Sequence, residues 1–170
     1  RERVHDEVRK MLTGKDPVQA MRLVKEFGLL EYVFKLPDQY ERFEMDQNSP
    51  HHEFNVWEHT IQVLNNIQEI IKGRDVSDAD KFIINMAALM HDVGKLDPKI
   101  KGAKEVEGKI QNSYHGHEAV SMRASEFILR NLPGVKVEEI EAIKKLIDGA
   151  RRVNPERRDT AVECQLSRKA

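Results

Sequence analysis

The sequence predicts an all-α protein, a compact bundle of helices. Along most of the chain, hydrophobic residues recur at spacings of three and four, as they do on one face of a helix. No segment alternates convincingly between apolar and polar residues, so no strand is predicted, and there is no internal repeat. With 170 residues, 39% of them hydrophobic, the chain can bury a core of its own.

The first part of the chain predicts three short helices and a loop. Asp16 followed by Pro17 is typical of a helix start, because proline fits the first helical position. Gly28 is a suitable residue to end the same helix. The expected elements are helices at 4–12, 17–27 and 29–34, followed by a polar loop at 40–50.

The second part predicts longer helices, starting with two that carry capping residues. Asn55 precedes Glu58 by three positions, and Ser77 precedes Asp80 in the same way. The helix after Ser77 is apolar nearly all round, so we expect it at the centre of the bundle. Residues 97–113 are rich in lysine and glycine and are expected to form a flexible loop over a candidate site at His91 and Asp92. The expected helices are 55–72, 77–92, 115–132, 137–149 and a last one within 155–170.

Composition excludes several classes of protein. The net charge is -1, so no overall charge draws the chain to nucleic acid, and any RNA contact must be a local patch. The single cysteine, Cys164, excludes an intrachain disulfide and fits a reducing compartment, so we expect a cytoplasmic protein. No apolar stretch is long enough to span a membrane.

The most informative feature is the pair His91-Asp92, which follows the apolar run at 82–90. A buried, unpaired carboxylate is costly, so Asp92 requires a cation or hydrogen-bond donors. A salt bridge to Lys95 is one solution, although it leaves an acid at the negative end of the helix dipole. A metal ion offsets that penalty. Gly94 is expected to end the helix by taking a positive φ.

Histidines gather around this pair. A mixed set of imidazoles and carboxylates suits one or two divalent metal ions. His59, His91 and Asp92 are the expected metal ligands. His117, at a helix start, is either a second-metal ligand or a contact to a phosphate or leaving group. Asp148 either completes the metal site or is simply an acid near a helix end. The flanking histidines are His51, His52, His59, His115 and His117, of which His52 and His115 are weaker candidates for contacts around the ligands.

Three further features each have two readings. Lys95 is either a phosphate-binding residue or a solvated lysine at a helix end. Trp57 is either a stacking platform for a base or, as we favour, a packed side chain. One basic segment is either an RNA contact or, by a small margin, a solvated surface; it contains Lys144, Lys145, Arg151, Arg152, Arg157 and Arg158.

The strings Asn-Val-Trp-Glu-His-Thr at 55–60 and Leu-Met-His-Asp-Val-Gly-Lys at 89–95 resemble the HD-domain superfamily. Its members are helical, metal-dependent phosphohydrolases. The resemblance implies hydrolysis of a phosphomonoester or phosphodiester, such as a 2′,3′-cyclic nucleotide or an RNA end, with Mg²⁺, Mn²⁺, Ni²⁺ or a similar ion. It implies catalytic roles for Asp92, Lys95 and His117.

A closer resemblance covers about residues 1–150. Residues 3–12, 16–24 and 27–30 are similar to the helical neck of bacterial tRNA nucleotidyltransferases, the CCA-adding or poly(A) polymerase family. Residues 47–60 and 114–118 are similar to the HD domain that many of these enzymes carry. We therefore expect a neck-like segment at 1–50 and an HD domain at 51–170, as a piece of a longer protein with tRNA as a possible partner.

The nucleotidyltransferase head is not in this sequence, so the chain is not expected to add CCA by itself. The late aspartate that usually closes an HD metal site, in an Ala-Asp context, has no counterpart before Ala170. One alternative is a non-catalytic RNA-binding or scaffold region of a tRNA nucleotidyltransferase. Another is a regulatory HD module that senses nucleotides without turnover.

Overall fold

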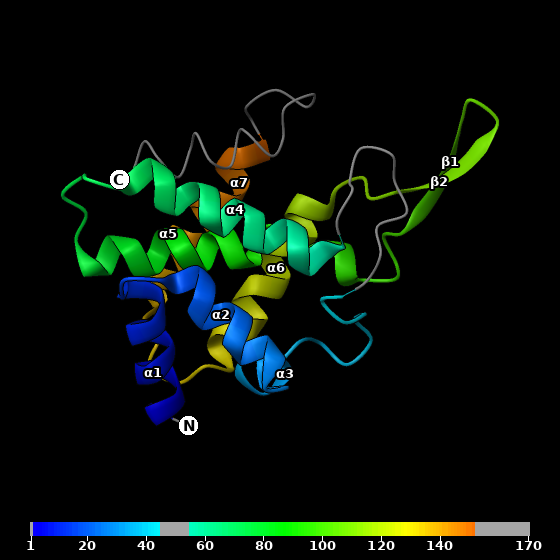
Figure 1. The fold of residues 1–170 in the computed structure, drawn as a ribbon. Coiled ribbons are helices and arrows are strands. Elements are labelled where there is room, and N and C mark those ends of the chain that lie inside the picture. The colour runs from blue at the N-terminus through cyan, green and yellow to red at the C-terminus, as the bar shows by residue number, and fades with distance from the viewer. Residues whose placement is uncertain (1, 45–54, 152–170) are drawn as a thin grey trace.

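The computed structural model describes residues 2–44 and 55–151, and this part of the chain is almost entirely helical (Figure 1). The prediction of an all-α bundle is confirmed, apart from one small hairpin. No helix in these ranges has the length and apolarity to cross a membrane. The elements are α1 (Glu2–Thr13), α2 (Pro17–Glu26), α3 (Leu30–Val33), α4 (Val56–Ile71), α5 (Asp78–Met90), the 3-10 helix η1 (Val93–Leu96), β1 (Gly102–Val106), β2 (Lys109–Ser113), α6 (His117–Arg130) and α7 (Val137–Arg151).

The predicted helix starts are confirmed by their caps. Asp16 caps α2 by accepting a backbone N–H with its carboxylate. Asn55 Oδ1 accepts the backbone N–H of Glu58 at 2.8 Å, and Ser77 Oγ accepts that of Asp80 at 3.1 Å. Each cap satisfies a backbone donor that the first turn of a helix leaves without a partner. These local signals set where the helices begin.

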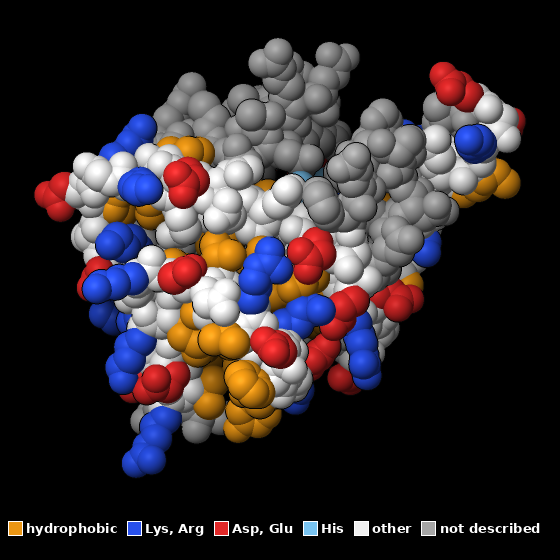
Figure 2. Space-filling model, viewed as in Figure 1, with side chains coloured by type: hydrophobic (Ala, Val, Ile, Leu, Met, Phe, Trp, Pro, Cys, Tyr) orange, Lys and Arg blue, Asp and Glu red, His pale blue; other side chains and the backbone are white. Residues whose placement is uncertain are grey.

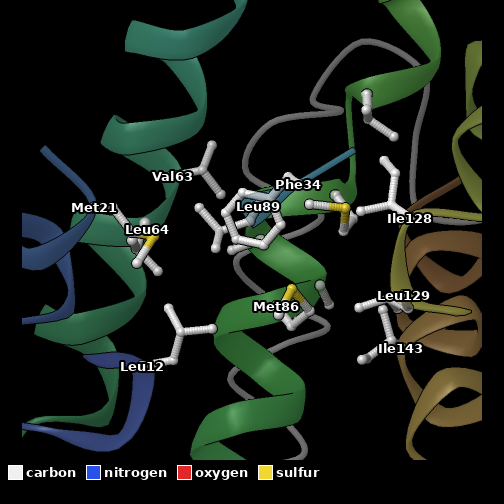
Figure 3. Close-up of a cluster of buried hydrophobic side chains, with 14 of the residues drawn as sticks. Leu12, Met21, Phe34, Val63, Leu64, Met86, Leu89, Ile128, Leu129 and Ile143 are labelled. Atoms are coloured by element: carbon white, nitrogen blue, oxygen red, sulfur yellow. The ribbon is translucent and has the colours of Figure 1, made fainter. Parts of the chain in front are cut away.

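Helix α5 is the centre of the hydrophobic core, as its apolar sequence predicts. It packs against α1, α4, α6 and α7. In the close-up of the core, Met86 and Leu89 of α5 lie between Leu12 on one side and Ile128 and Ile143 on the other (Figure 3). All five side chains are at most 2% exposed. Because α5 is surrounded in this way, the residues that follow it, His91 and Asp92, have a fixed position.

The first two helices pack directly onto the rest of the protein. Residues of α1 and α2 belong to the same hydrophobic cluster as those of α4 to α7. Arg9 of α1 bonds both carboxylate oxygens of Glu139 in α7 at 2.8 Å, and its guanidinium lies 3.9 Å from the ring centre of Phe82. The neck-like segment therefore shares one core with the helices that follow. The division into 1–50 and 51–170 stays a prediction.

The segment predicted as a flexible loop is instead a β-hairpin, so that prediction is wrong. Strands β1 and β2 are antiparallel, and Val106 pairs with Lys109 at the closed end. The turn residues Glu107 and Gly108 both have positive φ, of 51° and 75°, as a type I′ hairpin turn requires. Most of the hairpin is exposed. Without a buried face it needs no apolar alternation, which is why the sequence pattern does not reveal it.

Hydrophobic side chains also gather on the surface over α2 and α3 (Figure 2). Phe27 and Tyr32 are each 71% exposed, and Leu23 and Leu29 are partly exposed beside them. Apolar patches of this kind are often functional on monomeric proteins.

Candidate metal centre

The predicted pair and its partner histidine come together in the structure. His91 caps the C-terminus of α5, Asp92 precedes η1, and His59 comes from the first turns of α4. All three are buried, with 5%, 3% and 7% of their surface exposed. The helix ends at Met90, so the pair lies just beyond the last turn rather than inside it.

Three ligand atoms of these residues lie within 4.8 Å of one another. Nε2 of His59 and Nε2 of His91 are each 3.4 Å from Oδ2 of Asp92. Two donors that each lie about 2.1 Å from one ion at a tetrahedral angle are themselves about 3.4 Å apart. The spacing and the donor types therefore fit a divalent metal ion. This is the one group of this kind in residues 2–44 and 55–151.

The hydrogen bonding of His91 prepares its Nε2 atom for a cation. Nδ1 lies 2.6 Å from the carbonyl oxygen of Ala88, which can only accept, so Nδ1 carries the proton. In the neutral ring, Nε2 then has a lone pair, and this buried atom has no hydrogen-bond partner. It faces an oxygen of Asp92, another acceptor. Only a proton or a metal ion between the two acceptors makes this arrangement favourable.

His117 repeats the arrangement from the start of α6. Its Nδ1 lies 2.8 Å from the carbonyl oxygen of Tyr114, and its Nε2 lies 3.1 Å from Oδ1 of Asp92. Both carboxylate oxygens of Asp92 are thus faced by imidazoles whose far nitrogen bonds a backbone carbonyl. Such outer bonds fix the orientation and tautomer of metal-binding histidines.

Charge at the site is centred on Asp92. Burial alone would raise the pKa of its carboxyl, but His91, Lys95 and His117 together hold that pKa well below its ordinary value. Burial likewise opposes protonation of His91, but Asp92 and the Ala88 carbonyl outweigh it, and the pKa of His91 is raised. The site attracts positive charge.

Lys95 is part of this cluster. Its Nζ lies 2.8 Å from Oδ2 of Asp92, and the residue is 4% exposed, so the reading as a solvated helix-end lysine is wrong. The salt bridge weighed as an alternative for Asp92 is present. Because the histidines surround the same carboxylate, this salt bridge is compatible with the metal reading of Asp92, which stays a prediction.

Gly94 serves a different purpose from the predicted one. It does not take a positive φ, so its expected role as a left-handed helix stop is wrong. A Cβ at this position would collide with the carbonyl oxygen of His117 and lie 2.5 Å from the backbone nitrogen of Ser121. The Gly94 N–H donates to Ser121 Oγ at 2.8 Å. Glycine is needed so that η1 can lie directly against α6.

Ser121 and the two carbonyls are contributors that sequence reasoning missed. Any residue type can supply a backbone carbonyl, so Ala88 and Tyr114 carry no signal of their own. Their position in the chain does carry a signal, because each residue lies three positions before the histidine that its carbonyl orients. Ser121 lies one turn after His117 on the same face of α6, a spacing that could have identified it.

The remaining candidates are not members of the His59-His91-Asp92 group or lie outside the described residues. Asp148, half-buried in α7, is not a member of the metal-competent group, and its role stays a prediction. Trp57 is 1% exposed and packs edge-on against Phe43, so packing, not base stacking, is confirmed. His115 is exposed. His51, His52 and the basic residues from Arg152 onward lie outside the described residues.

The basic segment is partly accounted for. Lys144 bonds Glu126 at 3.0 Å and Glu141 at 3.3 Å, which raises the pKa of its ammonium. Lys144 thus has acidic partners on α6 and α7, which fits the solvated-surface reading.

Glu118 lies in the first turn of α6, as expected for an acid that stabilises a helix N-terminus.

The fold and this cluster define a helical protein with a buried His-His-Asp group suited to a divalent metal. The family model described as HD domain matches residues 56–168, which is well over half of the chain. The chain belongs to the HD-domain family. The predicted resemblance is confirmed.

A second family model, described as "Probable RNA and SrmB- binding site of polymerase A", matches residues 1–41. The two matches together support an HD-domain protein that resembles tRNA nucleotidyltransferases. No curated protein and no solved structure matches the chain.

Proposed function

We propose that the protein hydrolyses phosphoesters of nucleotides or RNA ends with a divalent ion held by His59, His91 and Asp92. One observation carries the proposal: the imidazoles of His91 and His117 point their Nε2 atoms toward the Asp92 carboxylate while their Nδ1 atoms bond backbone carbonyls. Membership of the HD-domain family supports it. We place this activity in the cytoplasm.

When bound, a divalent ion would polarise a phosphoryl oxygen and activate water. The chain's own residues would complete the site. The Lys95 ammonium, held at 2.8 Å from Asp92, provides positive charge for a phosphate. His117, oriented by the Tyr114 carbonyl, can hold a proton at Nε2 for the leaving oxygen. Asp148 would serve as a further ligand.

The test is metal content together with hydrolysis of bis(p-nitrophenyl) phosphate and 2′,3′-cyclic AMP after loading with Mn²⁺ or Ni²⁺. We expect the wild type to retain metal and turn over at least one substrate. His91→Ala should lose both properties, because it removes one ligand. His115→Ala is the matched control, since this neighbouring histidine is exposed. A folded, metal-loaded wild type that hydrolyses neither substrate would contradict the proposal.

The match of residues 1–41 favours a second candidate, a non-catalytic RNA-binding or scaffold region with tRNA as partner. In that case the His-His-Asp group is structural. A structural metal site is closed, whereas a catalytic one keeps an open coordination position. Tight RNA binding by a metal-loaded protein that shows no turnover and no exchangeable ligand on its metal would favour this candidate.

A further inference from the structure

The β1–β2 hairpin lies in the chain between two elements that carry residues of the candidate site. It joins η1, which carries Lys95, to α6, which begins with His117. In Figure 1 it stands out from the helical body beside the start of α6. With five residues per strand it extends roughly 16 Å. A ligand that lies along this hairpin therefore has one end at the cluster around Asp92.

The base of the hairpin is anchored at both ends. Tyr114, which follows β2, is buried, and its carbonyl oxygen is the atom that orients His117. On the other side, the carbonyl of buried Leu96 accepts the backbone N–H of Glu41 at 2.7 Å. The ends of the connection from Leu96 to Tyr114 thus have fixed positions relative to the site, whereas the strands between them are mostly exposed.

The register of the hairpin separates its charges by face. Residues on one strand alternate between faces, and paired residues share a face. Lys104 pairs with Gln111, and Val106 pairs with Lys109, so both lysines lie on one face with no acid in its strands. Glu105 lies on the opposite face with Ile110, and Glu107 lies in the turn.

These two lysines are available to a ligand. Both are exposed, and neither side chain forms an ion pair or hydrogen bond with any described residue. This differs from Lys10, Lys25 and Lys144, which all pair with glutamates. The space-filling view shows acidic, basic and apolar side chains spread over the projecting hairpin (Figure 2).

The chemistry of this face fits a polyanion better than a protein partner. A protein interface usually has an apolar centre, and Ile110, the one hairpin residue whose large apolar side chain is described as strongly exposed, lies on the other face. By register the lysine face carries one apolar residue, Val106. Lysines without partners are the usual contacts to a phosphate backbone. An isolated two-stranded hairpin is also only marginally stable in water, so a ligand would help to order it.

We propose that the Lys104–Lys109 face of the hairpin binds the phosphate backbone of single-stranded RNA, so that the substrate is an RNA chain whose terminal phosphoester reaches the Asp92 cluster. This inference rests on the proposed function for the chemistry at the cluster. Binding along the hairpin can be measured separately from it.

The test measures binding of a fluorescein-labelled single-stranded oligouridylate by anisotropy across a range of salt concentrations. Lys104→Gln/Lys109→Gln should weaken binding at low salt by about tenfold or more and reduce the salt slope by about 1.4, or 0.7 per lost phosphate contact. Lys72→Gln/Lys136→Gln is the matched control. It removes the same charge at two exposed lysines elsewhere and should bind like the wild type.

Hydrolysis of bis(p-nitrophenyl) phosphate is measured on the same proteins, because this small substrate does not extend along the hairpin. The hairpin variant should hydrolyse it as the wild type does. Equal RNA affinity of the wild type and the hairpin variant would overturn the inference, and so would a wild type that binds no RNA. Displacement of the RNA by polyglutamate at equal charge would also overturn it, in favour of an acidic protein partner. Hairpin-dependent RNA binding without any hydrolysis would support the binding surface and count against the proposed function alone.

Discussion

The helical core and the β1–β2 hairpin place lysine in opposite environments. Lys95 is 4% exposed and paired with Asp92 at 2.8 Å. Lys104, a short way along the chain, is exposed and has no charged partner among the described residues. A buried lysine is held in one place by its surroundings, whereas an exposed one adapts to what approaches. Under the two proposals above, the core would fix the chemistry and the hairpin would select the ligand.

The largest expected effect is that of removing the charge from Asp92. Asp92→Asn leaves the buried Lys95 ammonium without its carboxylate, and breaking a buried pair in this way costs about 3–5 kcal/mol. Urea unfolding of chelator-treated protein would measure the loss. The double variant Asp92→Asn/Lys95→Met should recover most of it, because the lone charge is gone. If the single variant is as stable as the wild type, the core does not depend on this pair.

Two side-chain truncations, one in the core and one on the hairpin, test how much packing in each region contributes to stability. Met86, at the centre of the core, is 0% exposed, and Met86→Ala should lower the free energy of unfolding by about 2–5 kcal/mol. Ile110 on the hairpin is 76% exposed, and Ile110→Ala should change it by less than about 0.5 kcal/mol. Chemical denaturation measures both. Similar losses for the two variants would show that the hairpin is part of the cooperative core.

A smaller effect is expected where η1 meets α6. Gly94→Ala places a methyl group against the backbone of His117 and Ser121, and overpacking of this kind costs about 1–3 kcal/mol. Because the two elements must move apart, metal affinity should fall as well. Gly73→Ala is the control: its Cβ meets nothing within 4 Å, so only the strain of its positive φ remains. Metal affinity equal to that of the wild type in Gly94→Ala would show that this close approach does not position the cluster.

The smallest effect concerns surface charge on the helices. The hydrogen bond from Lys144, and then that from Arg130, lowers the pKa of Glu126. Its stabilising contribution is therefore complete above the ordinary pKa of the carboxyl and is lost as pH falls through the lower folded value. Glu126→Gln should cost about 0.2–1 kcal/mol at pH 7 and nothing in strong acid. Thermal unfolding against pH, for variant and wild type, measures the difference, which should also shrink in high salt.

Local signals in the sequence were sufficient for the helices and for the centre of the bundle. Asn55 and Ser77 cap the helices that they were expected to cap, because a cap depends on residues within one turn. The apolar run before His91 likewise placed α5 at the centre. The sequence also predicts that His59, His91 and Asp92 come together, because their spacing resembles that of the HD-domain superfamily.

Non-local geometry is what the sequence did not reveal. The sequence predicts Gly94 as a helix stop, but glycine is required there because the backbone of α6, at His117 and Ser121, lies so close. The hairpin was missed because its turn residues, Glu107 and Gly108, are not the commonest pair for such turns and its strands have no buried face. The Ala88 carbonyl contributes through its place in the backbone and not through its residue type.

The antiparallel pairing of Gly102 with Ser113 has a consequence for how this protein could diversify. The two ends of the excursion meet at its base, so its length and content can change without altering the spacing between the segments that it joins. The base is therefore a position at which one inserted segment can replace another. Under the proposed function, exchanging the hairpin for another projecting module would redirect the His59-His91-Asp92 site to other ligands.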